Sequence, residues 1–109
     1  MLTEESDPRP HARGVFLKLT EMGHNIYLWC TAGEGYAAYT AWVLGVEDVV
    51  RSCFGKRSVP EDITVDFVVD DHPSWVDKYG GCLVRAYDGN PWDWELLGIV
   101  DAIGLRGTP

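Results

Sequence analysis

The chain has 109 residues, 46% of them apolar, and five tryptophans, which is enough for a single domain over residues 1–109 with a hydrophobic core. Its formal net charge of −8 repels phosphate backbones and anionic lipids, so we expect binding to neither nucleic acid nor membranes. The three cysteines are widely spaced without a CxxC pair, which predicts buried free thiols in a reducing cytoplasm rather than disulfides or zinc ligands.

Hydrophobic periodicity divides the chain into alternating helices and strands. Residues 1–8 are polar and expected to be mobile, and residues 1–13 lack the apolar core of a signal peptide. This alternation predicts an α/β fold with a three-layered, Rossmann-like parallel sheet. In chain order we expect a helix over 10–22, capped by Asp7 and stopped by Gly23, then a strand over 25–30, and then a helix over 34–44 that is closed by Gly45. The inner face of this second helix is expected to carry Tyr36, Thr40, Val43 and Leu44. After a basic loop over 51–60 we expect a strand over 63–70, a helix over 73–79, a strand over 82–87, a helix over 92–103 ended by Gly104, and a tail over 105–109.

Two adjacent carboxylates, Asp70 and Asp71, follow the apolar run of residues 63–69. Open α/β sheets bind ligands at the carboxyl ends of their strands. Neighbouring carboxylates repel each other unless a cation or proton intervenes, so the pair indicates a divalent-metal site with hard oxygen ligands. Aspartate at a strand end is also ordinary turn and helix-capping chemistry. His72, beside the pair, is a candidate for hydrogen bonding to a metal ligand.

A second candidate feature is Thr31-Ala32-Gly33, between the strand over 25–30 and the following helix. Free amides and the helix dipole attract anions at such a junction. Lys56 is a third candidate, because phosphoryl transfer needs a fixed cation against the charge of the transferring group. The plainer interpretation is a capping threonine, a turn-forming glycine and a solvated loop lysine.

The order of these features resembles the haloacid dehalogenase (HAD) superfamily. A strand ending at Thr31, then Lys56, then a strand ending at Asp70 and Asp71 is similar to the second, third and fourth motifs of that family. The resemblance covers residues 9–87 and implies a Rossmann-like sheet and Mg²⁺-dependent hydrolysis of small phosphorylated metabolites.

The resemblance also implies roles for single residues. Thr31 would hydrogen-bond the phosphoryl group within the phosphate-binding segment that includes Ala32 and Gly33. Lys56 would neutralise its charge, so Thr31 and Lys56 are the implied catalytic residues. Asp70, with Asp71, would hold Mg²⁺.

The first motif of the family, an apolar strand ending in Asp-x-Asp, has no counterpart before the first expected helix. Residues 1–9 contain no apolar run, and Asp7-Pro8-Arg9 lacks the second aspartate. We therefore expect no aspartyl-phosphate chemistry from these residues alone, and a sheet without its usual central strand. Three arrangements stay open: the flanking strands pair directly, a partner chain donates a strand, or the true start lies upstream.

Two functions are consistent with this sequence. The first is a HAD-type phosphohydrolase domain that lacks its nucleophile strand and is inactive as written. The second is a non-catalytic remnant that uses the exposed strand edges to bind a partner or form a homodimer.

Overall fold

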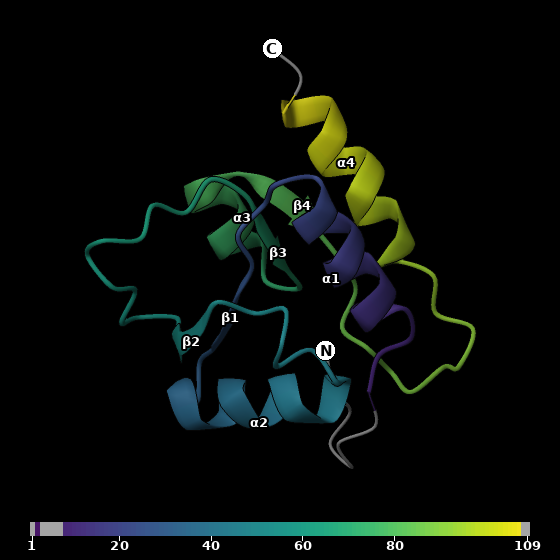
Figure 1. The fold of residues 1–109 in the computed structure, drawn as a ribbon, viewed down its shortest axis with the longest axis horizontal. Helices are drawn as coiled ribbons and strands as arrows, with labels where there is room; N and C mark the ends of the chain where they lie inside the picture. Colours follow the sequence, from purple (N-terminus) through teal and green to yellow (C-terminus); the bar gives the residue numbers. More distant parts are fainter. Residues whose placement is uncertain (1, 3–7, 108–109) are drawn as a thin grey trace.

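The computed structural model describes residue 2 and residues 8–107. The described part is a mixed α/β fold of helices and small parallel sheets (Figure 1). No helix within these ranges combines the length and apolar character that crossing a bilayer requires. In chain order the elements are α1 (Ala12–Glu21), β1 (Tyr27–Cys30), α2 (Glu34–Leu44), β2 (Ser52–Gly55), β3 (Val68–Asp70), α3 (Pro73–Tyr79), β4 (Gly81–Leu83) and α4 (Leu97–Gly107).

The strands form two separate parallel pairs. β1 pairs with β2, beginning with Tyr27 opposite Ser52. β3 pairs with β4, ending with Asp70 opposite Leu83. No backbone pairing joins β1 to β3 among the described residues, so direct pairing of these two strands, one of the arrangements left open by the sequence, is wrong for this structure.

β1 and β3 each have an edge without a neighbouring strand. The Lys56 amide donates to the Cys30 carbonyl (3.1 Å), so the backbone of Cys30 faces β2. Successive residues of a strand point their backbone N–H and C=O groups to opposite edges, so the backbone groups of Trp29 face away from β2. The Asp70 carbonyl likewise accepts a hydrogen bond from the segment after β4 (3.0 Å), which turns the backbone of Val69 away from β4. These two edges have no strand partner within the described ranges.

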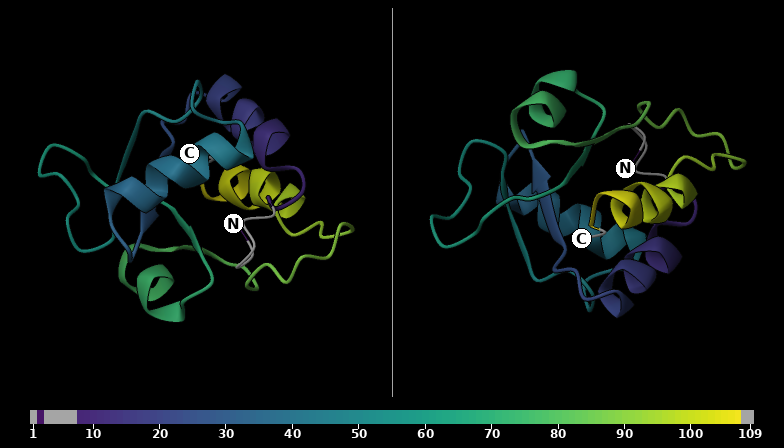
Figure 2. Two further views of the ribbon diagram at one scale, coloured as in Figure 1. Left: turned by 90° about the horizontal axis from the view of Figure 1, so that it is seen from below. Right: turned by 90° about the horizontal axis from the view of Figure 1, so that it is seen from above.

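The main hydrophobic core joins α1, α2, β1 and α4. Figure 2 shows α1 and α4 side by side in both views, with α3 on another side of the molecule. Leu96 and Val46 are fully buried, and Val69 of β3 packs against this core, which links the β3–β4 sheet to the rest. The fully packed members are Ala12, Val15, Phe16, Leu19, Leu28, Ala37, Ala41, Leu44, Val46, Leu96 and Ile99.

The ends of α2 and α3 were predicted correctly from the sequence. α2 ends at Gly45, whose φ of 69° is left-handed, and α3 ends at Gly80, as glycine at a helix end favours. The predicted inner face of α2 is partly wrong. Tyr36 is exposed, whereas Ala37 and Ala41 are buried, because small side chains let the helix approach β1 and β2 closely.

The basic segment over 51–60 is not a loop throughout, because it contains β2. Its charged residues flank a short apolar centre, Cys53 and Phe54, and Phe54 is buried. The other strands are shorter than expected. The three cysteines are free but only half-buried, so the predicted free thiols are confirmed and their full burial is wrong.

The predictions for the two terminal regions also need correction. α1 begins after His11, which has a left-handed φ of 70°, and the predicted cap Asp7 lies outside the described residues. The last helix begins at Leu97 rather than near 92, because the side chains of Asp88, Asn90 and Asp93 accept backbone hydrogen bonds two residues further on (2.9–3.1 Å). Such local bonds compete with helix formation. α4 continues past Gly104, so residues 105–107 belong to a helix and not to a tail.

Candidate functional site

The candidate site is built around a buried ion pair at the carboxyl ends of β2 and β3. Lys56 Nζ lies 2.7 Å from Asp70 Oδ2, and the residues are 9% and 5% exposed. Lys56 directly follows β2, and Asp70 is the last residue of β3. The pair therefore ties together two sheets that share no backbone hydrogen bond.

Asp70 has two further hydrogen-bond donors. The indole Nε1 of Trp29 donates to Oδ2 (3.1 Å), and the amide of His72 donates to Oδ1 (2.9 Å). Burial alone would raise the pKa of the Asp70 carboxyl. The hydrogen bonds from Lys56 and the His72 amide outweigh burial and lower this pKa below its usual value. Asp70 is thus held as a carboxylate.

The Trp29 ring lies against the ion pair and belongs to an aromatic cluster. The Trp29 ring lies 5.8 Å from Lys56 Nζ and 5.2 Å and 5.9 Å, centroid to centroid, from Trp75 and Tyr79 of α3. Phe54 of β2 meets it edge-on at 6.5 Å. Because Lys56 and Asp70 are buried beside this ring, their attraction is screened less by water than that of an exposed pair.

The predicted phosphate-binding segment lies beside this pair. Thr31 directly follows Cys30, whose carbonyl accepts the Lys56 amide, and Thr31 is exposed. The backbones of Gly33 and Gly55 approach so closely that a Cβ on Gly55 would lie 3.4 Å from the Gly33 Cα. That distance is close to ordinary van der Waals contact, so it is the positive φ of 105° at Gly33 that favours glycine in this segment.

The amides of this segment are partly used already. The Gly33 amide donates to the Cys30 carbonyl (3.1 Å), and the Ala32 amide makes a weak contact of 3.4 Å with the Cys30 sulfur. The expectation of free amides at this junction is therefore wrong for Gly33. The Thr31 hydroxyl, at the exposed turn, is the better-placed donor of this segment.

The residues suited to a metal ion are Asp70 and Asp71. Ligand atoms of Asp70, Asp71 and His72 all lie within 4.8 Å of one another, and Asp71 is exposed. Mg²⁺ takes one or two carboxylates and keeps several water ligands, so the two aspartates fit it. Imidazole suits softer metals, so His72 fits Mg²⁺ less well.

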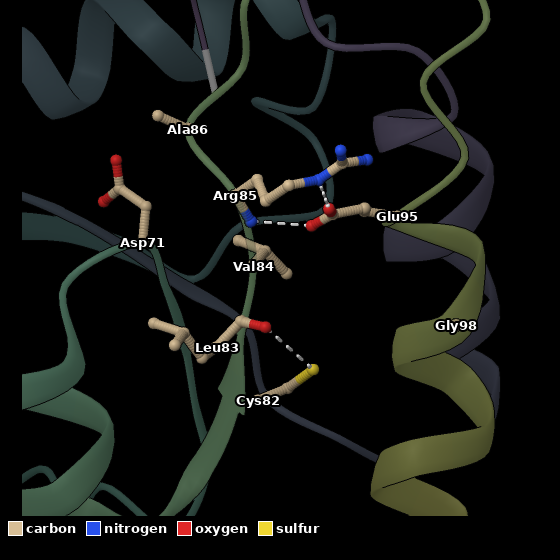
Figure 3. Close-up of a pocket in the computed structure, with 8 residues that line it drawn as sticks. All are labelled: Asp71, Cys82, Leu83, Val84, Arg85, Ala86, Glu95 and Gly98. Atoms are coloured by element: carbon tan, nitrogen blue, oxygen red, sulfur yellow. Dashed lines mark hydrogen bonds and ion pairs between the residues drawn. The ribbon is translucent and has the colours of Figure 1, made fainter.

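A hollow of about 500 Å³ opens beside Asp71. In Figure 3, Asp71 and Leu83 lie on one side of the extended segment that continues β4, and the Arg85–Glu95 pair lies on the other. The amide of Arg85 donates to Glu95 Oε2 (2.7 Å). The hollow is lined by Asp71, Cys82, Leu83, Val84, Arg85, Ala86, Glu95 and Gly98.

No family model, curated protein or solved structure matches this chain. The structure brings Lys56 and Asp70 into contact, places Asp71 beside Asp70, and puts Thr31 one residue from the backbone contact between β1 and Lys56.

Sequence reasoning missed Trp29 as part of the site. The signal was present, because an indole N–H inside an apolar strand needs a hydrogen-bond acceptor when it is buried. Asp70 is the buried acceptor that it finds.

Proposed function

We propose that the chain is a HAD-type phosphohydrolase domain that carries the phosphate-binding and Mg²⁺-binding residues but not the nucleophile. The observation that supports this most directly is the buried Lys56–Asp70 pair, where the ends of β2 and β3 meet. Residues predicted from separate motifs contact each other there, and Thr31 and Asp71 lie at the same end of their strands.

Each side chain has a distinct role in the proposed chemistry. The Thr31 hydroxyl donates to a phosphoryl oxygen, and the Lys56 ammonium neutralises charge on the transferring group. Asp70 and Asp71 bind Mg²⁺, which supplies charge neutralisation when bound. The hollow beside Asp71 leaves room for the organic part of a phosphate ester next to that carboxylate.

The edges of β1 and β3 that have no strand partner among the described residues support the proposal of a missing central strand. The backbones of Trp29 and Val69 face away from their paired neighbours, as a strand lying between them would require. A strand in that position would join the two sheets into the three-layered, Rossmann-like arrangement, and its last residues would lie beside Lys56 and Asp70. We infer that the carboxylate nucleophile comes from such a strand.

An activity assay tests the proposal. The 109-residue protein should not hydrolyse p-nitrophenyl phosphate with or without Mg²⁺. The same protein with an N-terminal apolar strand ending in Asp-x-Asp should hydrolyse it in a Mg²⁺-dependent way. The matched control carries Asn in place of the first added aspartate and should be inactive. A folded, extended protein without turnover would contradict the enzyme proposal.

A non-catalytic binding module is the second candidate, and one observation favours it. Tyr36, Tyr39 and Trp42 are 45%, 41% and 64% exposed on α2, with ring centroids 6.0 Å and 6.1 Å apart. Such an uncharged aromatic row fits a second copy of the chain. Light scattering after size exclusion should then give a dimer that Trp42→Glu dissociates, whereas a monomer at all concentrations would argue against this function.

A further inference from the structure

Trp29 and Lys56 share one oxygen of Asp70. The indole Nε1 lies 3.1 Å from Oδ2, and Lys56 Nζ lies 2.7 Å from the same atom. The other oxygen, Oδ1, receives a single hydrogen bond, from the His72 amide at 2.9 Å. The two oxygens of this carboxylate therefore have different surroundings.

The hydrogen-bonding capacity of a carboxylate determines what remains available. An ionised carboxylate has about four acceptor positions, two on each oxygen. Lys56 and Trp29 occupy both positions on Oδ2, and His72 occupies one on Oδ1. One position remains, on the oxygen bonded to the His72 amide.

We propose that Trp29 is a positioning residue that fixes the rotation of the Asp70 carboxylate, so that Oδ1 alone meets a divalent cation shared with Asp71. The inference rests on the proposed function and extends it to a residue outside the expected motifs. Trp29 touches neither the cation nor the phosphate, and acts only through Asp70.

The surroundings of Trp29 suit this role. Its ring contacts Trp75 and Tyr79 of α3 and Phe54 of β2, so the indole has little freedom to turn. The backbone of Trp29 belongs to β1, which ends beside Thr31. The hydrogen bond thus fixes the metal-binding carboxylate of β3 relative to the phosphate-binding end of β1.

Cation affinity of the intact chain tests this inference. Trp29→Phe keeps a ring in the cluster and removes the indole donor, and Trp75→Phe makes the same change where the indole has no hydrogen bond to Asp70. Groups that orient metal ligands typically contribute 10–100-fold in affinity. Calorimetric titration with Mg²⁺ and with Mn²⁺ should show at least about tenfold weaker binding by Trp29→Phe and a change within about twofold for Trp75→Phe.

A spectroscopic readout keeps the test independent of how well Trp29→Phe folds. In the unsubstituted protein, Mg²⁺ should shift the indole N–H resonance of Trp29 more than that of Trp75, and Asp70→Asn should also shift it. Equal affinities of the Trp29→Phe and Trp75→Phe variants, or equal resonance shifts, overturn the inference and leave the proposed function intact. Absence of Mg²⁺ and Mn²⁺ binding by the unsubstituted protein overturns both.

Discussion

At the scale of single residues, the Lys56–Asp70 pair makes the clearest energetic prediction. Lys56→Met leaves the Asp70 carboxylate buried without its cation, which should lower the free energy of unfolding by about 3–5 kcal/mol. Urea denaturation measures this change. The double variant Lys56→Met/Asp70→Leu should recover most of the loss, because it removes both charges. The control Lys18→Met removes a cation from an exposed pair with Glu21 and should change stability by less than about 0.5 kcal/mol. A loss for Lys56→Met as small as that of the control would contradict this account.

Acid sensitivity is a second prediction at this scale. Burial alone would raise the pKa of the Asp70 and Asp93 carboxyls, but hydrogen bonds from Lys56 and Arg9, respectively, lower both below the usual value of 3.8. Between the folded and unfolded pKa the unfolded chain binds more protons, so stability rises with pH there. The urea midpoint should therefore fall steeply between about pH 5 and about pH 3. Asp93→Asn should flatten this slope, and a pH-independent midpoint of the unsubstituted protein would be inconsistent with the two carboxylates being stabilised by folding.

At the scale of elements, Gly81 is required for the β3–β4 pairing. It has a φ of 152°, and a Cβ at this position would collide with the backbone carbonyl of Val68. Gly81→Ala should destabilise the protein by more than about 2 kcal/mol, through strain and loss of strand pairing. Gly98→Ala is the matched control, because nothing lies within 4 Å of its added Cβ, and in a helix it should be neutral or stabilising by about 0.5–1 kcal/mol. Thermal unfolding of both variants checks the difference, and equal melting temperatures would argue against the parallel pairing.

The elements also mark where local sequence determines structure. The ends of α2 and α3 were predicted correctly, because Gly45 ends α2, and Pro73 and Gly80 begin and end α3. β2 was missed, since its two apolar residues become a strand only through tertiary pairing with β1. The turns over 88–96 replaced part of the last predicted helix for a reason visible in the sequence, namely three side chains that can bond to the backbone locally.

At the scale of the whole molecule, the proximity of Lys56 and Asp70 was more predictable from the sequence than the arrangement of the strands around them. Lys56 was expected in a basic loop and Asp70 at the end of a strand, as residues of one site, and they lie in contact. Trp29 was not singled out, because its role depends on the side-chain packing between β1 and α3. Hydrophobic periodicity also could not predict that the strands form two separate parallel pairs. It indicates where strands lie in the sequence but not which strands pair with each other.

The central claim is that the ends of β1, β2 and β3 form one anion and metal site. An NMR titration of the ¹⁵N-labelled protein with inorganic phosphate in the presence of Mg²⁺ tests this most directly. We predict that the amides of Thr31, Lys56, Asp70 and Asp71 shift together with a single affinity, and that Thr31→Val weakens it while leaving the fold unchanged. Shifts confined to other surfaces, or separate affinities for Thr31 and for the two aspartates, would contradict the claim.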